Sequence, residues 1–64
     1  MDQTLDIFEK LPEGSSIWRA AVNGPQNAIG KLQELSLHFH NELYVVDLRT
    51  KTVIATKQSP APAN

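Results

Sequence analysis

The sequence predicts a small α+β domain, with a four-stranded, mainly antiparallel sheet and one helix packed on one face. Three observations predict this fold. Apolar and polar residues alternate near the start of the chain, as they do in a half-buried strand. A central segment after an Asn-Gly-Pro sequence repeats its apolar residues at helical spacing, and two runs rich in β-branched residues follow it. The 64 residues allow one domain, and a chain of this length buries only about 60% of its unfolded surface.

The first predicted element is a β-hairpin. Residues 4–11 alternate with a period of two, which is the period of a strand. Residues 12–15, Pro-Glu-Gly-Ser, supply the residue types that favour a turn. Residues 16–22 form the predicted returning strand. Alternation along that strand places Trp18 on the same side as Ala20, so we expect the indole in the core.

The central helix is predicted to begin at Pro25, because proline is favoured at the first helical position, and Gly24 is then the expected N-cap. Leu37 points away from the apolar stripe of this helix, so it is exposed or the helix ends before it. Asn41 is the expected C-cap, since asparagine tolerates a positive φ. The stripe has spacings of one, three and four and contains Ala28, Ile29, Leu32, Leu35, Ser36 and Phe39.

The second predicted hairpin has strands over residues 43–48 and 53–57. Residues 49–52 connect them without an Asn-Gly or Asp-Gly pair, so the type of turn stays open. The strand orders 1-2-4-3 and 2-1-3-4 both give a wholly antiparallel sheet, and the sequence does not choose between them. We expect one domain over residues 1–57 and a disordered tail over 58–64, which has two prolines and no large apolar residue.

One segment carries a resemblance. Asn-Glu-Leu-Tyr-Val-Val-Asp-Leu-Arg-Thr, starting at Asn41, follows a strand with Trp18 and a helix centred on Ala28. This pattern resembles short bacterial proteins of unassigned role that have a hairpin–helix–hairpin arrangement. Those proteins often have glycine at the position of Asn41 and glycine after the threonine of the last turn, where this chain has Lys51. The resemblance covers about residues 4–57 and implies a ββαββ fold, with no activity or ligand.

Composition excludes several classes of protein. The chain has no cysteine, which excludes disulfide scaffolds, thiolate metal sites and thiol nucleophiles. Six basic and seven acidic residues leave it nearly neutral, which argues against electrostatic capture of nucleic acid or anionic lipid. No apolar run approaches the roughly 20 residues that span a bilayer, and the first residues lack the segments of a signal peptide. We therefore expect a cytoplasmic protein without membrane association.

No group of residues predicts catalysis. His38 and His40 are the one pair with metal-ligand character, but they lie about 200° apart on a helix and a site needs at least three ligands. The four serines lack a glycine-framed nucleophile motif, and the three glycines form no phosphate-binding loop. We expect no enzymatic activity, metal, cofactor or small-molecule substrate.

Apolar residues occupy both faces of the predicted sheet, although one helix covers only one face. A monomeric antiparallel sheet normally presents polar residues to water, and small domains often complete their core by oligomerising. We therefore expect a non-enzymatic protein-interaction or self-association module, most simply a homodimer, that uses the uncovered face. The sequence leaves open which face the helix covers. We expect the partner-binding residues to be Phe8, Ile17, Ala21, Leu43, Val45 and Ile54, centred on Val45 and Ile17.

The alternative function is that of a small nucleic-acid-binding regulator. Arg49, Lys51 and Lys57 cluster around the last hairpin, and Arg19 projects from the second strand. With aromatic neighbours on an open sheet face, these cations would form a basic platform. However, a basic hairpin is also a common protection of a sheet edge against aggregation. We therefore expect a protein partner rather than nucleic acid.

Overall fold

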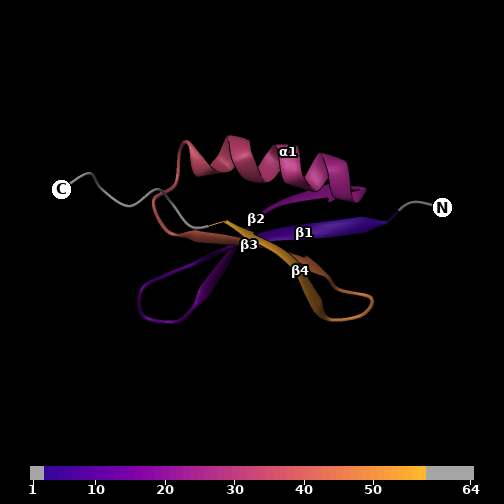
Figure 1. The fold of residues 1–64 in the computed structure, drawn as a ribbon. Helices are drawn as coiled ribbons and strands as arrows, with labels where there is room; N and C mark the ends of the chain where they lie inside the picture. The colour runs from indigo at the N-terminus through magenta and orange to yellow at the C-terminus, as the bar shows by residue number, and fades with distance from the viewer. Residues whose placement is uncertain (1–2, 58–64) are drawn as a thin grey trace.

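The computed structural model describes residues 3–57, and its elements follow the order strand, strand, helix, strand, strand (Figure 1). The helix lies on one face of a single four-stranded sheet, so the predicted α+β fold is confirmed. The predicted tail, residues 58–64, lies outside the described residues. The elements are β1 (Thr4–Lys10), β2 (Ser16–Asn23), α1 (Pro25–Ser36), β3 (Glu42–Asp47) and β4 (Thr52–Lys57).

The sheet has the order β2-β1-β3-β4, and every neighbouring pair is antiparallel. This is one of the two orders that the hairpin pattern allows. The two central strands, β1 and β3, belong to different hairpins, and residues far apart in the sequence meet between them, such as Ile7 and Val45. β2 and β4 are the two edges of the sheet.

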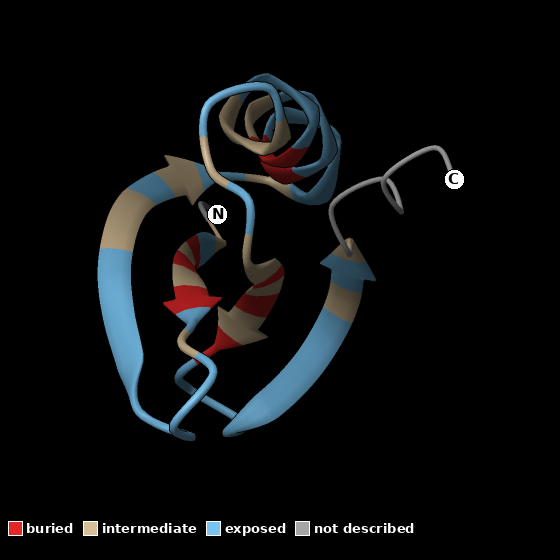
Figure 2. Cartoon of the chain, turned by 90° about the vertical axis from the view of Figure 1, so that its left-hand side faces the viewer, coloured by how far each residue is buried: buried red, intermediate tan, exposed pale blue. Residues whose placement is uncertain are grey.

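The core lies between the helix and the two central strands (Figure 2). Leu5 and Ile7 of β1 are fully buried there, and Ala28 and Leu32 of α1 cover them. Residues from the edge strands and from the last turn of the helix surround this cluster, and they are Val22, Leu35 and Ala55. The edge strands therefore contribute less to the core than β1 and β3.

Leu43 and Val45 correct the sequence-based assignment of faces. The predicted partner-binding surface places both on the uncovered face, but both are fully buried in the core under α1. The run Leu-Tyr-Val-Val is apolar on both sides of the strand. Alternation therefore shows that Leu43 and Val45 share a face, but it does not show which face the helix covers. Tyr44 and Val46 lie on the uncovered face instead.

A β-bulge in β2 of the first hairpin also changes which side of the sheet its side chains lie on. Ile7 of β1 pairs with Ala20 of β2. The next residue, Phe8, pairs with Trp18, so Arg19 is the extra residue of the bulge. One extra residue moves the side chains beyond it to the other face. The core position predicted for Trp18 is therefore wrong, and its side chain lies on the uncovered face, 55% exposed.

The helix begins where the sequence predicts and ends earlier than the apolar stripe. Gly24 is the N-cap with a φ of 85°, and Pro25 is the first helical residue. The C-cap is Leu37, which is 82% exposed, so the assignment of Asn41 as the C-cap is wrong. The buried stripe is also narrower than expected, because Ala28 and Leu32 are the residues of the helix that are buried in the core. Ile29, a residue of the predicted stripe, is 50% exposed.

The turn between β3 and β4 contains a strained residue. Lys51 has a φ of 56°, in the left-handed region that costs a non-glycine residue roughly 1–2 kcal/mol. Glycine adopts such a φ without that cost. Lys51 therefore makes this turn less stable than a glycine at the same position would.

Two substitutions on α1 test which side of the helix is buried. Leu32→Ala should lower the free energy of unfolding by about 2–5 kcal/mol, because it leaves a cavity beside the central strands. Ile29→Ala, an apolar truncation on the same helix, should cost less than about 1 kcal/mol, since half of that side chain is already in water. Urea denaturation measures both values. Equal losses would contradict the observed orientation of the helix.

Candidate functional site

The open face, by which we mean the side of the sheet away from α1, carries three rows of side chains that cross the strands. Their order follows from the register of the paired residues. The aromatic row crosses all four strands and consists of Trp18, Phe8, Tyr44 and Thr56. The valine row lies on one side of it and consists of Ala21, Asp6, Val46 and Val53. The charged row lies on the other side and consists of Ser16, Lys10 and Glu42.

The aromatic row is held in place by its own contacts. The rings of Phe8 and Tyr44 stack with their centroids 5.6 Å apart and an interplanar angle of 20°, a kind of pair that adds about 0.5–1.5 kcal/mol. The hydroxyl of Tyr44 donates a hydrogen bond to Oγ of Ser16 at 2.6 Å. Nε1 of Trp18 donates to Oδ1 of Asp6 at 2.9 Å. The polar atoms of the aromatic side chains therefore have partners while the indole stays largely in water.

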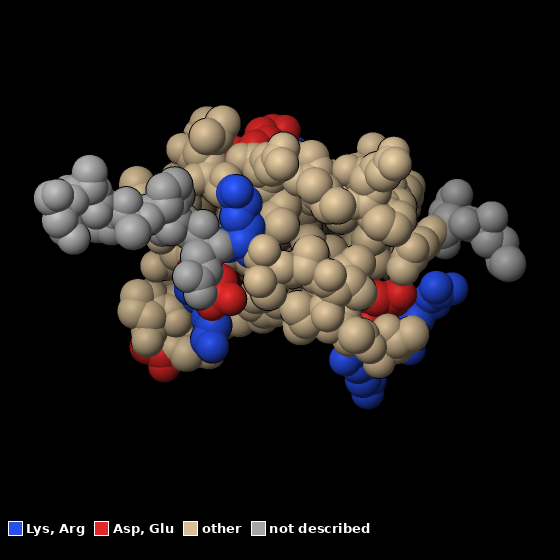
Figure 3. All heavy atoms as spheres, viewed as in Figure 1, with Lys and Arg blue, Asp and Glu red and all other residues tan. Residues whose placement is uncertain are grey.

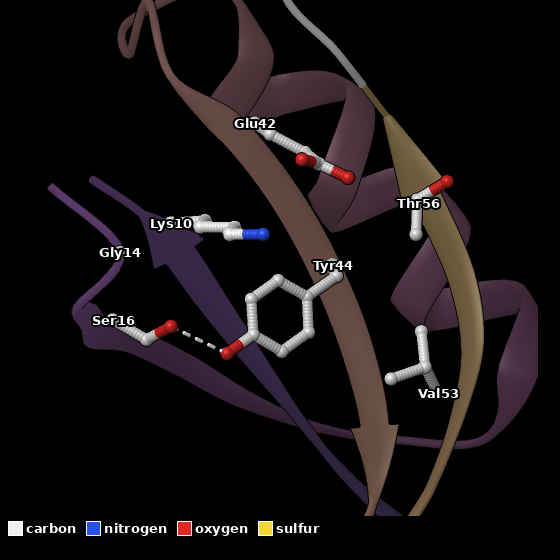
Figure 4. A pocket seen from close by; sticks show the side chains of 7 residues that line it. All are labelled: Lys10, Gly14, Ser16, Glu42, Tyr44, Val53 and Thr56. Carbon is white, nitrogen blue, oxygen red and sulfur yellow. Dashed lines mark hydrogen bonds between the residues drawn. The ribbon is translucent and has the colours of Figure 1, made fainter. Parts of the chain in front are cut away.

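A hollow of about 420 Å³ lies beside the Tyr44 ring (Figure 4). Its walls come from the charged row, from the first hairpin turn and from the edge strand β4. Figure 4 shows the side chains of Lys10 and Tyr44 reaching into the same space, with Val53 and Thr56 on the β4 side. The complete lining is Lys10, Gly14, Ser16, Glu42, Tyr44, Val53 and Thr56.

The six residues expected to form the partner-binding surface do not lie together. Phe8 and Ala21 are on the open face, whereas Leu43 and Val45 are in the core. Ile17 lies beyond the bulge of β2 and pairs with a β1 residue that points toward the helix.

Ile54 is the extra residue of a second bulge, because Val45 pairs with Ala55 and Val46 with Val53. Its side chain is exposed, as is that of Ile17. The expected centre of the surface at Val45 and Ile17 is therefore wrong, because one residue is buried and the other lies on the opposite side of the sheet from Phe8. The open face also carries four residues outside the six expected ones, and they are Trp18, Tyr44, Val46 and Val53.

The four basic residues of the nucleic-acid alternative lie at three separate places. Arg19 is on β2 and Lys57 at the end of β4, and these strands are opposite edges of the sheet. Arg49 and Lys51 lie in the β3–β4 turn, at the other end of β4 from Lys57. Blue side chains occupy the lower right of Figure 3, where Figure 1 shows that turn. Within residues 3–57, the four cations therefore share no common surface.

Arg19 belongs to a partly buried ion pair under the loop that follows α1. Its Nε donates a hydrogen bond to Oε1 of Glu9 at 2.9 Å, and its Nη2 donates to the same oxygen. The Phe39 ring covers the guanidinium, and Cζ of Arg19 lies 4.2 Å from the centroid of that ring. Nδ2 of Asn41 donates to the other oxygen of Glu9 at 2.8 Å. These partners compensate for the burial of Glu9, which is 4% exposed.

The pKa of Glu9 is lowered from its ordinary value of 4.5. The main cause is the hydrogen bond from Arg19, and the bond from Asn41 and the positive charge of the guanidinium act in the same direction. Burial opposes them, because it disfavours the charged carboxylate. Glu9 is therefore a structural anion that joins β1, β2 and the segment after the helix.

A second buried carboxylate, Asp47, lies at the end of β3. It accepts hydrogen bonds from Nε2 of Gln3 and from the backbone N–H of Arg49, both at 3.0 Å. The pKa of Asp47 is lowered, chiefly by the hydrogen bond from Gln3, although burial acts in the opposite direction. This carboxylate anchors the start of the β3–β4 turn.

The described residues also bear on metals and membranes. His38 and His40 follow the helix, and no group of three or more His, Asp or Glu side chains within residues 3–57 could hold a metal ion. In the same part of the chain, no helix has the length and apolar character needed to cross a membrane.

Comparisons with protein-family models, curated proteins and solved structures give no match to this chain. The resemblance to short bacterial proteins therefore stays a prediction.

Replacing Glu9 tests the partly buried ion pair through the pH dependence of stability. Because folding lowers the pKa of Glu9, its ionised form stabilises the fold above the ordinary value of 4.5. This stabilisation is lost as the pH falls through the lowered pKa of the folded state. Glu9→Gln should therefore be less stable than the wild type at neutral pH and lose less stability on acidification. Urea denaturation at a series of pH values measures the free energy of unfolding of both proteins. An equal loss of stability on acidification in the two proteins would contradict this role of Glu9.

Proposed function

We propose that this chain is a small non-enzymatic protein-interaction module that binds a protein partner through its open face. The observation that carries the proposal is the aromatic row. Trp18 is 55% exposed beside the stacked Phe8 and Tyr44 rings. Tryptophan and tyrosine are enriched among the residues that dominate binding energy in protein interfaces. The cytoplasmic location expected from the sequence is part of the same proposal.

The apolar side chains of the open face are contiguous rather than scattered. Val46 and Val53 of the valine row continue the aromatic row on β3 and β4, where Val53 is 53% exposed, while Asp6 and Ala21 complete the row on β1 and β2. Single exposed apolar residues are normal on a protein surface, but a contiguous apolar patch with a polar rim is typical of a docking site. The charged row supplies such a rim on one side, with Lys10 and Glu42.

The largest side chains of the open face are already held in place by hydrogen bonds. The hydrogen bonds from Tyr44 to Ser16 and from Trp18 to Asp6 limit the rotation of the two largest side chains on this face. Side chains that are already ordered lose less conformational entropy when a partner covers them. The structure offers the nucleic-acid alternative no comparable support, because Arg19 is engaged by Glu9 and Phe39.

Site-specific photo-crosslinking in the native cell tests this function. A benzophenone amino acid in place of Val53 lies on the open face, and the same group in place of Gln33 lies on the exposed side of α1. We expect discrete protein adducts from position 53 and none from position 33, because only the open face should be covered by a partner. No adduct at position 53, equal adducts at both, or adducts that a nuclease removes would contradict the proposal.

A further inference from the structure

We infer that the partner is a second copy of this chain, and that two copies pack open face on open face about a two-fold axis running between β1 and β3, parallel to these strands. The inference rests on the proposed function and names its partner. The rows, the charges beside them, the hollow and the twist of the sheet each fit a second copy in this arrangement.

The rows of the open face complement themselves about this axis. A two-fold axis between the central strands places β1 over the partner's β3 and β2 over the partner's β4. Because Phe8 and Tyr44 are register partners, Phe8 then faces Tyr44 of the second copy, and Tyr44 faces Phe8 of that copy. Trp18 and Thr56 lie at the two ends of the same row, so Trp18 of each copy faces Thr56 of the other. One rotation therefore matches the whole aromatic row.

The same two-fold rotation also matches the charged row with that of the second copy. Lys10 and Glu42 are opposite each other on β1 and β3, but the ion pairs within residues 3–57 involve other residues. The axis brings Lys10 to the partner's Glu42 and Glu42 to the partner's Lys10. A two-fold interface needs one self-complementary patch, and opposite charges side by side satisfy this condition, whereas two like charges would repel.

The hollow lies where the axis places the partner's indole. Thr56 and Val53 line the hollow, and Thr56 is the residue that faces the partner's Trp18. Each copy thus presents one largely exposed aromatic side chain and one recess for it. Nε1 of Trp18 already donates to Asp6 at 2.9 Å, so covering the indole leaves no buried donor without an acceptor.

The twist of the sheet allows the two faces to meet. Figure 1 shows both hairpin turns bending away from the helix, one at each end of the sheet. They belong to opposite edges, β2 and β4, so two diagonally opposite corners project toward the partner. Rotation about an axis along the strands places each projecting corner over a receding corner of the second copy. Sheets with the same twist pack in this way with nearly aligned strands.

Charge reversal with mixing tests this arrangement. Lys10→Glu or Glu42→Lys alone places like charges at both symmetric contacts of the homodimer, so each should weaken dimerisation by at least about tenfold. An equimolar mixture of the two variants restores both opposite-charge contacts, so heterodimers should form with nearly wild-type affinity. The double variant, with both changes in one chain, should also dimerise. Mixing cannot restore a contact within one chain, so its rescue effect reports only on contacts between copies.

Analytical ultracentrifugation between about 5 and 500 µM covers the expected micromolar range. Trp18 is the one tryptophan of the chain, so a shift of its emission to shorter wavelengths with concentration independently reports its burial. Glu34→Lys, a charge reversal on the exposed side of α1, is the matched control and should leave dimerisation unchanged.

Each contrary result has a distinct meaning. A wild type that stays monomeric throughout this range would overturn the second-copy inference, while the crosslinking at position 53 would still decide the proposed function. A wild-type dimer that either reversal leaves intact, or that mixing fails to restore, would overturn the arrangement about this axis.

Discussion

The ion pair between the buried Glu9 and the half-buried Arg19 is the interaction on which the rest of this structure depends. Glu9 lies on the covered face of a central strand, in phase with Leu5 and Ile7, and a carboxylate buried there without a partner would be strongly destabilising. Arg19 reaches it as the extra residue of the β2 bulge. The same bulge reverses the alternation of β2 and turns Trp18 to the open face. A structural requirement of the covered face therefore determines the composition of the other face.

The topology then arranges the open face symmetrically. The central strands come from different hairpins, and the aromatic pair of Phe8 and Tyr44 lies across their junction. Lys10 and Glu42 occupy the same junction one row away, with opposite charges. A sheet whose centre is built in this way is complementary to a second copy of itself. The helix contacts all four strands, but its buried residues share the core with residues of the central strands, and both edge strands stay partly exposed.

The sequence predicts the elements well because their determinants are local. Gly24 and Pro25 start the helix, and alternation and turn residues define the strands. It does not predict the faces, because β3 is apolar on both sides and a bulge depends on pairing between distant residues. Of the expected partner-binding residues, Phe8 and Ala21 are on the open face, while Leu43 and Val45 are in the core. One pattern in the sequence points to the covered face of β1. Glu9 continues the alternation of Leu5 and Ile7, and a charge among core residues requires a basic partner.

The central claim is that the bulge at Arg19 places Trp18 on the open face, away from the helix. Nuclear Overhauser contacts of the indole protons, measured by NMR on the dilute protein, test it most directly. The account predicts contacts from the Trp18 ring to Asp6 and Phe8, its hydrogen-bond acceptor and its register partner on β1. Contacts from that ring to Leu32 or Leu35 of α1 would contradict the account, because they would place the indole in the core.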